Sequence, residues 1–482
     1  MKYFVALLLV LWQPALSAQE TILMLDAGPK RIYSIIDKAD GSNEFIIALA
    51  EENRVNFYLF DNNWKSIGQF NEKREWVAEQ SVYEDYKRFS AKPNVYFSKG
   101  FESLGTISKA SKQLITSFRR NQNVYFQQID FTANKTTNLD LWKAPSKERI
   151  LHTFNLNNKI YWITYGGKKD DDINLYSFDN NQEIEEKTFS IKGLRRPGVY
   201  RGENRSAIGS EFIDNDKQTD LLESSARLKF YAQKNTLYIV SDDWMGKTII
   251  EQIDLNNFQQ TTTVIEQKPN GNPGKPISHQ NSFLLNDHLL QVNVCNGTFT
   301  FRILNLNTKK EAIYSFDKSM EIEFRNTDVM QYGQGLFSAE EKKLNKPSQF
   351  LRKVDSEALS VMAQANDNGI EVTMGSSQLV RTRGGMTHVP GAVSTPGEVA
   401  SGSWISTGFY DSETKTIFFK GFFDKNNYQH IKGELSLHDK MKQVDDFYDR
   451  RKESAVNPLI IDETIFSAYY DKDSKKFILV RF

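Results

Sequence analysis

An all-β fold, built as a single β-propeller of about seven blades, is predicted for this chain, with six or eight blades as the alternatives. Short runs of alternating apolar residues, bounded by Asn, Asp, Gly and Lys, recur throughout and indicate strands and hairpins. One strand–turn–strand pattern also repeats along the chain. The rival fold, a string of β-sandwich domains, would need composition breaks and linkers, and the sequence contains neither. We expect helix only as short segments within insertions.

The repeated pattern is an aromatic or β-branched strand, a polar turn that begins at Asp or Asn, and a more polar strand. The turns begin at Asp61, Asp130, Asp179, Asp254 and Asn305, and a weaker copy spans Tyr428–Leu437. Asp and Asn suit this position because their short side chains bond the nearby backbone and tolerate left-handed conformations. Asp130 and Asp179 are 49 residues apart and Asp254 and Asn305 are 51 apart, which matches blades of about 40 to 50 residues.

The remaining blades are predicted from the stretch after the fifth anchor and from the two ends of the chain. A degenerate blade is expected around Gly369–Met374. The C-terminal strands Ile465–Tyr470 and Lys476–Phe482 should share one sheet with Thr21–Leu25 and Ile32–Ile36, which closes the ring and removes exposed strand edges. Whether this closing sheet is an eighth blade or part of a seventh stays open at this level.

The first eighteen residues have the layout of a secretory signal peptide. Lys2 gives a positive start, Phe4–Trp12 is an apolar run too short to span a bilayer, and Ala15–Ala18 is a small-residue stretch suited to cleavage. The only cysteine, Cys295, lies far from this region, so no lipid-attachment cysteine follows the leader. We therefore expect residues 1–18 to be removed and residues 19–482 to form one propeller domain in the periplasm or outside the cell.

Charge and composition exclude several classes of protein. The chain has 61 Lys and Arg against 61 Asp and Glu, and loss of the leader leaves 60 against 61. This balance excludes an electrostatic nucleic-acid binder, which needs a basic surface. No later apolar run of about 18 residues occurs, so no transmembrane segment is predicted. The 33 Phe, 20 Tyr and 7 Trp exclude a disordered chain and supply a large core. We expect a monomer.

Four insertions interrupt the repeat, near residues 71–100, 193–225, 326–365 and 381–404. Pro347–Ala365, in the third of them, is predicted to be a short helix that begins at its proline. The second and fourth carry arginines beside aromatic residues, and guanidinium groups bind carboxylates bidentately. The candidate binding residues are Arg195, Arg196, Tyr200, Arg201, Arg381, Arg383, His388 and Trp404. We expect the two insertions to converge on one face of the ring.

Motifs for catalysis or for a cofactor are not recognisable. Met245–Thr248 resembles the end of a phosphate-binding loop, but Ser241 stands where that loop needs glycine and a strand follows. Asp214–Asp220 has oxygen ligands at alternate positions, yet it lacks the glycine and the late Glu of a calcium loop. The six histidines are scattered, and His152 is expected to be structural. His288 is expected to be structural too, and Cys295 to be a buried thiol. No cofactor and no metal are predicted, and catalytic residues are unknown.

With its leader, its strands rich in Asn, Lys and Phe, and its repeated anchors, the sequence resembles uncharacterised exported β-propeller proteins of Bacteroidetes-type bacteria. The resemblance implies the fold and the export route and supplies no catalytic residues. Ser241–Trp244 is the nearest approach to the Ser-x-Asp-x-Gly-x-x-Trp turn of sialidase-like propellers, and that motif is absent. The Gly-His and Trp-Asp pairs of WD40 blades are missing as well.

Two functions compete at the level of sequence. In the favoured interpretation the protein is a non-catalytic binding or assembly module that holds a protein or glycan partner at the bacterial cell envelope. The alternative is a carbohydrate-active enzyme, a glycosidase or lyase, that uses paired carboxylates such as Glu398. Glycoside hydrolysis needs two carboxyl groups about 5 to 9.5 Å apart, a distance that a sequence does not reveal.

Overall fold

The structure, a computed structural model, describes residues 20–26, 31–51, 54–73, 102–120, 122–139, 141–145, 148–166, 172–191, 210–214, 219, 221–242, 246–269, 277–332, 342–355, 358–366, 369–382, 411–433, 455–461, 464–471 and 473–482. These residues form seven β-sheets of four or five strands and two short helices, α1 (Leu221–Ser224) and α2 (Pro347–Val354). The predicted all-β class is confirmed, and both helices lie in predicted insertions. Neither helix is long and apolar enough to cross a membrane.

The sheets are numbered here as blades 1 to 7 in chain order. Blade 1 contains β2 (Arg31–Lys38), β3 (Phe45–Glu51), β4 (Arg54–Phe60) and β5 (Ser66–Lys73). Blade 2 contains β6 (Glu102–Ala110), β7 (Gln113–Arg120), β8 (Asn123–Asp130), β9 (Lys135–Asn138) and β10 (Trp142–Lys143). Blade 3 contains β11 (Arg149–Leu156), β12 (Lys159–Tyr165), β13 (Asp172–Phe178) and β14 (Ile184–Ser190).

The second half of the chain forms four more blades. Blade 4 contains β15 (Ser210–Phe212), β16 (Leu228–Gln233), β17 (Thr236–Asp242), β18 (Lys247–Asp254) and β19 (Gln260–Glu266). Blade 5 contains β20 (His279–Leu285), β21 (His288–Cys295), β22 (Thr298–Asn305) and β23 (Glu311–Phe316). Blade 6 contains β24 (Val329–Tyr332), β25 (Lys342–Leu344), β26 (Ala358–Asn366), β27 (Gly369–Thr382) and β28 (Asp411–Phe423). Blade 7 contains β29 (Ala455–Ile461), β30 (Thr464–Asp471), β31 (Lys476–Arg481) and β1 (Glu20–Asp26).

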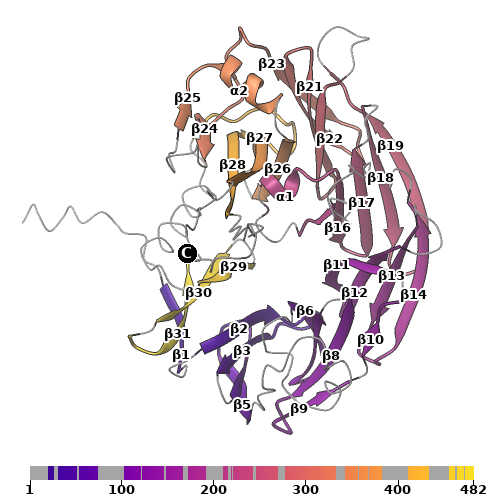
Figure 1. Ribbon diagram of the computed structural model, residues 1–482, viewed down its shortest axis with the longest axis vertical. Helices are drawn as coiled ribbons and strands as arrows, with labels where there is room; N and C mark the ends of the chain where they lie inside the picture. The colour runs from indigo at the N-terminus through magenta and orange to yellow at the C-terminus, as the bar shows by residue number, and fades with distance from the viewer. Residues whose placement is uncertain are drawn as a thin grey trace, which may run out of the picture.

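The blades follow one another in chain order around a ring, as in a β-propeller (Figure 1). Strands β16 and β26 lie on the inner side of the ring, and β14 and β19 lie on its outer side (Figure 1). Within most blades the strands pair antiparallel in sequence order, but β15 pairs with β16 in parallel. The predicted number of about seven blades agrees with the seven sheets of the described residues.

Both ends of the described chain meet in blade 7, as predicted. Strand β1 pairs antiparallel with β31, with Met24 opposite Ile478. The prediction that Ile32–Ile36 also belongs to this closing sheet is wrong, because these residues lie in β2 and pair with β3 of blade 1. Strand β3 is buried along its whole length, so it needs a paired strand on each side, and β2 supplies one of them.

The Asp and Asn side chains that begin the turns accept hydrogen bonds from the turn backbone, as predicted. The Asp61 carboxylate accepts bonds from the backbone N–H groups of Asn63 and Lys65, both at 2.9 Å. Asn305 serves the same function in blade 5, where the turn places Lys309 at a φ of 61°. The left-handed conformation recurs at one residue of each such turn: Trp64, Asn134, Gln182, Phe258, Lys309 and Tyr428. Tight turns need this conformation, and the Asp or Asn bonds stabilise it.

Two predictions about the sixth blade are corrected. Gly369–Met374 does not begin a separate blade, because it lies in β27 and pairs with β28 of the same sheet. The anchor of this sheet is Asp424, whose side chain accepts bonds from the N–H groups of Asn426 and Asn427. The predicted copy therefore began too late, and its end at Leu437 lies outside the described residues. This turn follows β27 and β28, which have 14 and 13 residues and are the longest of the described strands, so the interval to this anchor is longer than the others.

Apolar side chains between neighbouring blades form the core. Trp162 packs between blades 2 and 3 beside Phe126, and Phe230 packs between blades 3 and 4. Helix α2 begins at Pro347 as predicted and inserts the fully buried Phe350 against blades 5 and 6. It ends at Val354, however, because the following apolar residues form β26 instead of helix. Cys295 is buried, as predicted.

Candidate functional site

Most of the residues predicted to bind a partner lie outside the part of the chain that the structure describes. These are Arg195, Arg196, Tyr200, Arg201, Arg383, His388 and Trp404, together with the alternative catalytic residue Glu398. Arg381 lies in β27 opposite Ser412 of β28, and only its backbone is described. The convergence of the two arginine-bearing insertions on one face therefore stays a prediction.

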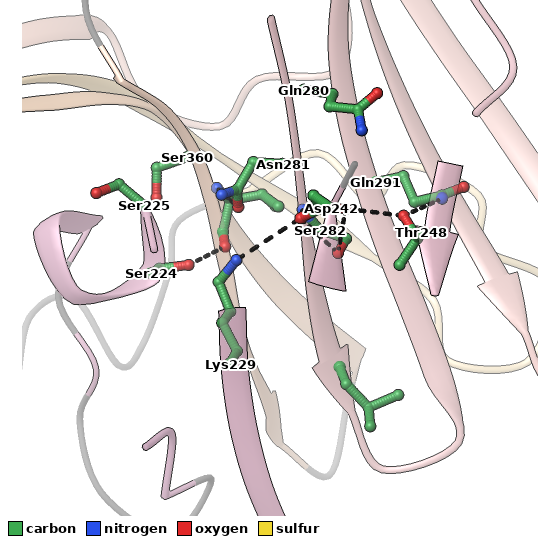
Figure 2. A network of polar contacts seen from close by, with 12 residues as sticks. Ser224, Ser225, Lys229, Asp242, Thr248, Gln280, Asn281, Ser282, Gln291 and Ser360 are labelled. Carbon is green, nitrogen blue, oxygen red and sulfur yellow. Dashed lines mark hydrogen bonds and ion pairs between the residues drawn. The ribbon is translucent and has the colours of Figure 1, made fainter. Parts of the chain in front are cut away.

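A buried polar cluster lies where blades 4, 5 and 6 meet (Figure 2). Its central residue is Lys229 of β16. Period-two alternation along β16 turns Leu228 and Phe230 toward blade 3, and turns Lys229 and Tyr231 toward blade 5. Tyr231 confirms this direction, because its hydroxyl accepts the backbone N–H of Leu284 at 3.2 Å. Lys229 is thus inside an interface between blades, where a charged side chain is uncommon.

Asp242, at the end of β17, is the acceptor of this cluster. Its Oδ1 accepts bonds from the hydroxyls of Thr248 at 2.8 Å and Ser282 at 2.9 Å, and its Oδ2 accepts the backbone N–H of Ser282 at 2.9 Å. Thr248 lies directly opposite Asp242 in the β17–β18 pair, and Ser282 comes from β20 of the next blade. The carboxylate therefore joins blade 4 to blade 5 with hydrogen bonds that do not involve Lys229.

Lys229 has donors that nothing in the described residues accepts. Its side chain is fully buried, and its Nζ lies 3.9 Å from Asp242 Oδ2. This distance allows electrostatic attraction, but it exceeds hydrogen-bond length, and Nζ has no hydrogen-bond partner. Burial lowers the pKa of Lys229 to about 8, and the nearby charge of Asp242 only partly opposes this shift. The cluster therefore contains an amine that gives up its proton more readily than an ordinary lysine.

From Asp242 the polar contacts continue toward the outside of the ring. Gln291 donates to the Thr248 hydroxyl at 2.9 Å and accepts from Arg302 Nη1 at 2.9 Å. Arg302 in turn pairs with Glu311, which also binds Lys268. These two cations lower the pKa of Glu311, with the Lys268 hydrogen bond as the largest cause. An unbroken row of polar side chains thus runs from the buried cluster to exposed Lys268.

Helix α1 covers this region from the inner side of the ring (Figure 1). The Ser224 hydroxyl donates to the Val361 carbonyl of β26, and the Ser360 hydroxyl donates to the Leu221 carbonyl at 2.8 Å. The N–H of Val361 donates to Asn281 Oδ1 of β20 at 3.4 Å. Because the chain runs from α1 directly into β16, α1 ties blade 4 to blade 6 beside the first strand of blade 5.

The two histidines predicted to be structural, His152 of β11 and His288 of β21, both have structural contacts. His288 Nε2 lies 3.1 Å from the Tyr428 hydroxyl. His152 Nε2 lies 2.9 Å from Ser210 Oγ, a serine–histidine contact that the sequence did not reveal, because the residues are 58 positions apart. Burial, and secondarily the charge of Arg119, lower the pKa of His152 to about 4. Such a ring is a poor general base, and among the described residues no carboxylate contacts it to complete a triad.

Each remaining buried carboxylate of the described chain accepts bonds from nearby donors. Glu51 pairs with Arg54 and Asn56, and Glu371 with Lys420 at 2.7 Å. Asp130 accepts from Gln113, and Glu251 accepts from Gln260 and Thr262. Within the described ranges no cluster of three His, Cys, Asp or Glu side chains could hold a metal ion. The buried acids described here therefore act as acceptors that fix the sheets.

The fold and the site define the protein as a β-propeller with a lysine-centred polar cluster under a short inner helix. No protein-family model matches the chain. No curated protein sequence is significantly similar to it.

Solved structures give distant matches. The chain is similar to the SapL1 lectin in complex with alpha methyl fucoside, at 8% identity and a TM-score of 0.24, over 73% of this chain and 90% of that one. It is similar to an oligogalacturonate lyase in complex with manganese, at 9% identity and a TM-score of 0.29, over 73% and 82%. A protein from Lactobacillus plantarum matches at 9% and 0.27, over 64% and 83%. At these identities and TM-scores the matches carry no argument about function.

Proposed function

We propose that the protein is exported and acts as a non-catalytic binding or assembly module for a protein or glycan partner at the bacterial cell envelope. The observation that carries this proposal is that the described buried acids, and His152 and His288, are engaged in contacts within the scaffold. Glu371 pairs with Lys420, Asp242 accepts from Thr248 and Ser282, and their counterparts elsewhere have similar partners. Side chains engaged in this way stabilise a scaffold, and they do not form the facing carboxyl pair that glycoside hydrolysis needs.

The same observation, that the described buried groups serve the scaffold, supports a partner site on the two arginine-bearing insertions. Because the blades supply a rigid ring, recognition is left to the insertions, which is where repeat scaffolds commonly carry it. Arg383 and Trp404 combine a bidentate donor with an aromatic surface, a pair suited to an acidic sugar or an acidic peptide. Export is proposed from the leader at residues 1–18.

Pull-down from an envelope extract with the mature chain tests the proposal. We expect a discrete partner with the parent chain and a clear loss of capture with Arg383→Ala or Trp404→Ala. Both variants should unfold like the parent, because the partner site is proposed to lie on insertions outside the sheets, and substitutions away from the core change stability by about 0.5 kcal/mol or less. Lys187→Ala, on the exposed strand β14, is the matched control and should capture normally.

Two results would contradict the proposal. The first is parent-level capture by both insertion variants, which would place the partner elsewhere. The second is turnover of a glycan panel that Glu398→Gln abolishes, which would make the protein the carbohydrate-active enzyme of the alternative hypothesis. Intact mass of the native protein tests export separately, since retention of residues 1–18 would contradict processing.

A further inference from the structure

Two histidines lie where the turns of blades 5 and 6 meet, His288 at the start of β21 and His430 after β28. The Nε2 of His288 lies 3.1 Å from the Tyr428 hydroxyl, and the two rings meet edge to face with centroids 5.5 Å apart. Tyr428 is buried and occupies the left-handed position of the Asp424 turn. The contact between His288 and Tyr428 therefore joins blade 5 to the turn that follows β28 in blade 6.

The amide of Asn305 determines which nitrogen of His288 carries the proton. Its Oδ1 accepts the N–H groups of Asn307 and Thr308, at 2.9 and 2.8 Å, so its Nδ2 is the atom that lies 3.4 Å from His288 Nε2. An amide nitrogen only donates, so the Nε2 beside it must accept. The other ring nitrogen of His288 carries the proton and donates it to the Leu285 carbonyl.

The Tyr428 hydroxyl is an acceptor and a donor at once. Burial raises the pKa of Tyr428, and the hydrogen bond from the Asn305 side chain partly opposes this shift. Because the hydroxyl oxygen accepts from Asn305, its own proton is available to His288 Nε2. A doubly protonated His288 has no acceptor to offer, and its new N–H is directed at two groups that were donating to it.

His430 lies at the same junction in the opposite role. Its Nε2 lies 2.9 Å from Asn326 Oδ1, which also accepts the Phe422 N–H at 2.7 Å. Asn326 Nδ2 donates to the carbonyls of Ile431 and Gly433, so the amide orientation is fixed and His430 Nε2 is the donor. A second proton on His430 is added at Nδ1 and leaves this bond intact.

We propose that His288 is an acid-sensitive contact between blades 5 and 6, which accepts the Tyr428 hydroxyl while the ring is neutral and loses this bond when the ring is protonated. The blade 6 turn is then held by fewer bonds. Lys310 Nζ still donates to the Asn426 carbonyl at 2.7 Å, and the Tyr314 hydroxyl still donates to the Tyr428 carbonyl. The turn therefore loosens in acid without leaving blade 5. This inference does not rest on the proposed partner site.

The direction of the pH effect follows from burial. Burial lowers the pKa of His288 below its ordinary value of 6.5, and Asp287 and the bond to Leu285 only partly oppose the shift. The unfolded chain therefore binds more protons just below pH 6.5, so the contact is complete above this pH and weakens as the pH falls toward the lower, folded pKa.

Few other groups at the junction titrate in this range. The charged side chains of its three turns are Asp287, Lys309, Lys310, Asp424 and Lys425, and Lys432 follows His430. Lysine and aspartate ordinarily titrate outside pH 5 to 7, and the N–H groups of Asn427 and Asn426 lower the pKa of Asp424 further. Burial, and secondarily the charge of Lys432, lower the pKa of His430. His430 is thus the group that a control must separate from His288.

Hydrogen exchange of residues 424–429, followed by mass spectrometry and corrected for the intrinsic effect of pH, measures the contact. Two bonds protect this turn, from the Asp424 N–H to the Gln429 carbonyl and from the Tyr428 N–H to the Asp424 carbonyl, both at 2.9 Å. We expect protection to fall about three- to tenfold from pH 7 to pH 5, as for the loss of one hydrogen bond. Residues 254–259 of blade 4 are the internal reference, because they form the same two bonds and none of the described histidines bonds to them.

Three variants assign the response. His288→Gln should remove it, because glutamine places a neutral amide near the position of Nε2. Tyr428→Phe should lower protection at pH 7 and also remove the response, since it keeps the ring and deletes the hydroxyl. His430→Gln is the matched control and should respond like the parent.

Several results would overturn the proposal. One is equal protection of the parent turn at the two pH values, and another is a fall that residues 254–259 share, which would report loosening of the whole ring. A response that persists in His288→Gln and Tyr428→Phe, or that disappears in His430→Gln, would assign the effect to another group. No envelope partner is present in these measurements, so failure here and failure of the pull-down are separate results.

Discussion

The face of blade 5 that packs on blade 6 carries a cluster of aromatic rings, whereas the face that packs on blade 4 carries a row of polar side chains. On the first face, Phe299 contacts Phe419 of β28, with ring centroids 6.2 Å apart. On the second face, Ser282, Gln291 and Arg302 lie opposite one another across three adjacent strands and bond to blade 4. Both faces belong to the same strands, because successive side chains point to opposite sides.

The two faces contribute to the fold in different ways, one through stability and the other through the alignment of neighbouring blades. Apolar packing is non-directional and contributes roughly in proportion to the area that is buried, so the aromatic face supplies stability. Hydrogen bonds are directional, and a buried polar row holds only if every member keeps its partner. The polar row therefore fixes the register of blades 4 and 5. Lys229 enters the same interface from blade 4, and its amine lies outside the row, without a hydrogen-bond partner. Chemistry is expected at this face and stability at the other.

Removal of the blade 6 ring that packs on the aromatic face of blade 5 should have the largest effect. Phe419 is fully buried and contacts the rings of Phe299, Phe316, Phe324 and Phe350. Phe419→Ala should lower the free energy of unfolding by about 3–5 kcal/mol, measured by urea denaturation. Phe419→Leu is the graded control and should lose less, because it leaves a smaller cavity. Equal losses for the two variants would indicate that this face is not packed as described.

At the polar face, Lys229→Met should have the opposite sign and stabilise the protein. The pKa of Lys229 falls from 10.5 to about 8 on folding, so the unfolded chain binds more protons between these values and stability rises as pH rises. The penalty is complete below pH 8 and amounts to roughly 3 kcal/mol. Met removes the ammonium and leaves Asp242 with its Thr248 and Ser282 donors.

Unfolding of the parent and of Lys229→Met across pH 7.5 to 10.5 checks this prediction. The gain from methionine should be greatest below pH 8 and should become small as pH rises through 10.5, since the parent lysine then loses its proton in the unfolded state as well. Comparison of the two proteins cancels the titration of Arg227 and of the buried tyrosines. A variant that is less stable than the parent at every pH would show that Lys229 stabilises the interface.

Arg302 tests the polar row with the smallest expected effect. Its guanidinium donates to Gln291, to Glu311 and to the Glu266 carbonyl of blade 4. Arg302→Met should cost about 1.5–3 kcal/mol, the usual range for bonds to a charged group, and Arg302→Lys should recover only part of it. Lysine keeps the charge, but its single nitrogen does not span the three acceptors. Full recovery in lysine would show that charge, not geometry, holds the row.

The fold could be predicted because its signal is local. Asp61, Asp179 and Asp254 bind the backbone of their own turns, so the repeat can be seen without knowledge of tertiary contacts. The strands and the turn anchor of blade 6 were predicted wrongly, because its strands do not pair in sequence order. Strands β24 and β25 precede the inner strands in the sequence, yet they pair on the outer side of the blade. Ile32–Ile36 was misplaced for a similar reason, since an apolar strand does not reveal which of two sheets it joins.

The lysine-centred cluster was missed because its signal is tertiary. In the run Leu228 to Tyr231, alternation alone suggests that Lys229 faces water. Blades pack on both faces, however, so the alternate side of β16 is also buried, and Lys229 has no exposed surface. The one available clue was a charged residue placed between the apolar residues Leu228 and Phe230. The partner site on the insertions stays a prediction, since its residues lie outside the described ranges.

Pairing of β1 with β31 has a consequence for the order of events during synthesis. A ribosome makes Glu20–Asp26 early and Lys476–Arg481 more than 400 residues later, as the 450-position span between Asp26 and Lys476 shows. The ring therefore closes only after nearly all of the described chain has been made. Blades 2 to 5, by contrast, have both neighbouring blades well before that point. A chain interrupted before β31 leaves β1 without its neighbour and β30 with an open edge, which is a template for association with other chains.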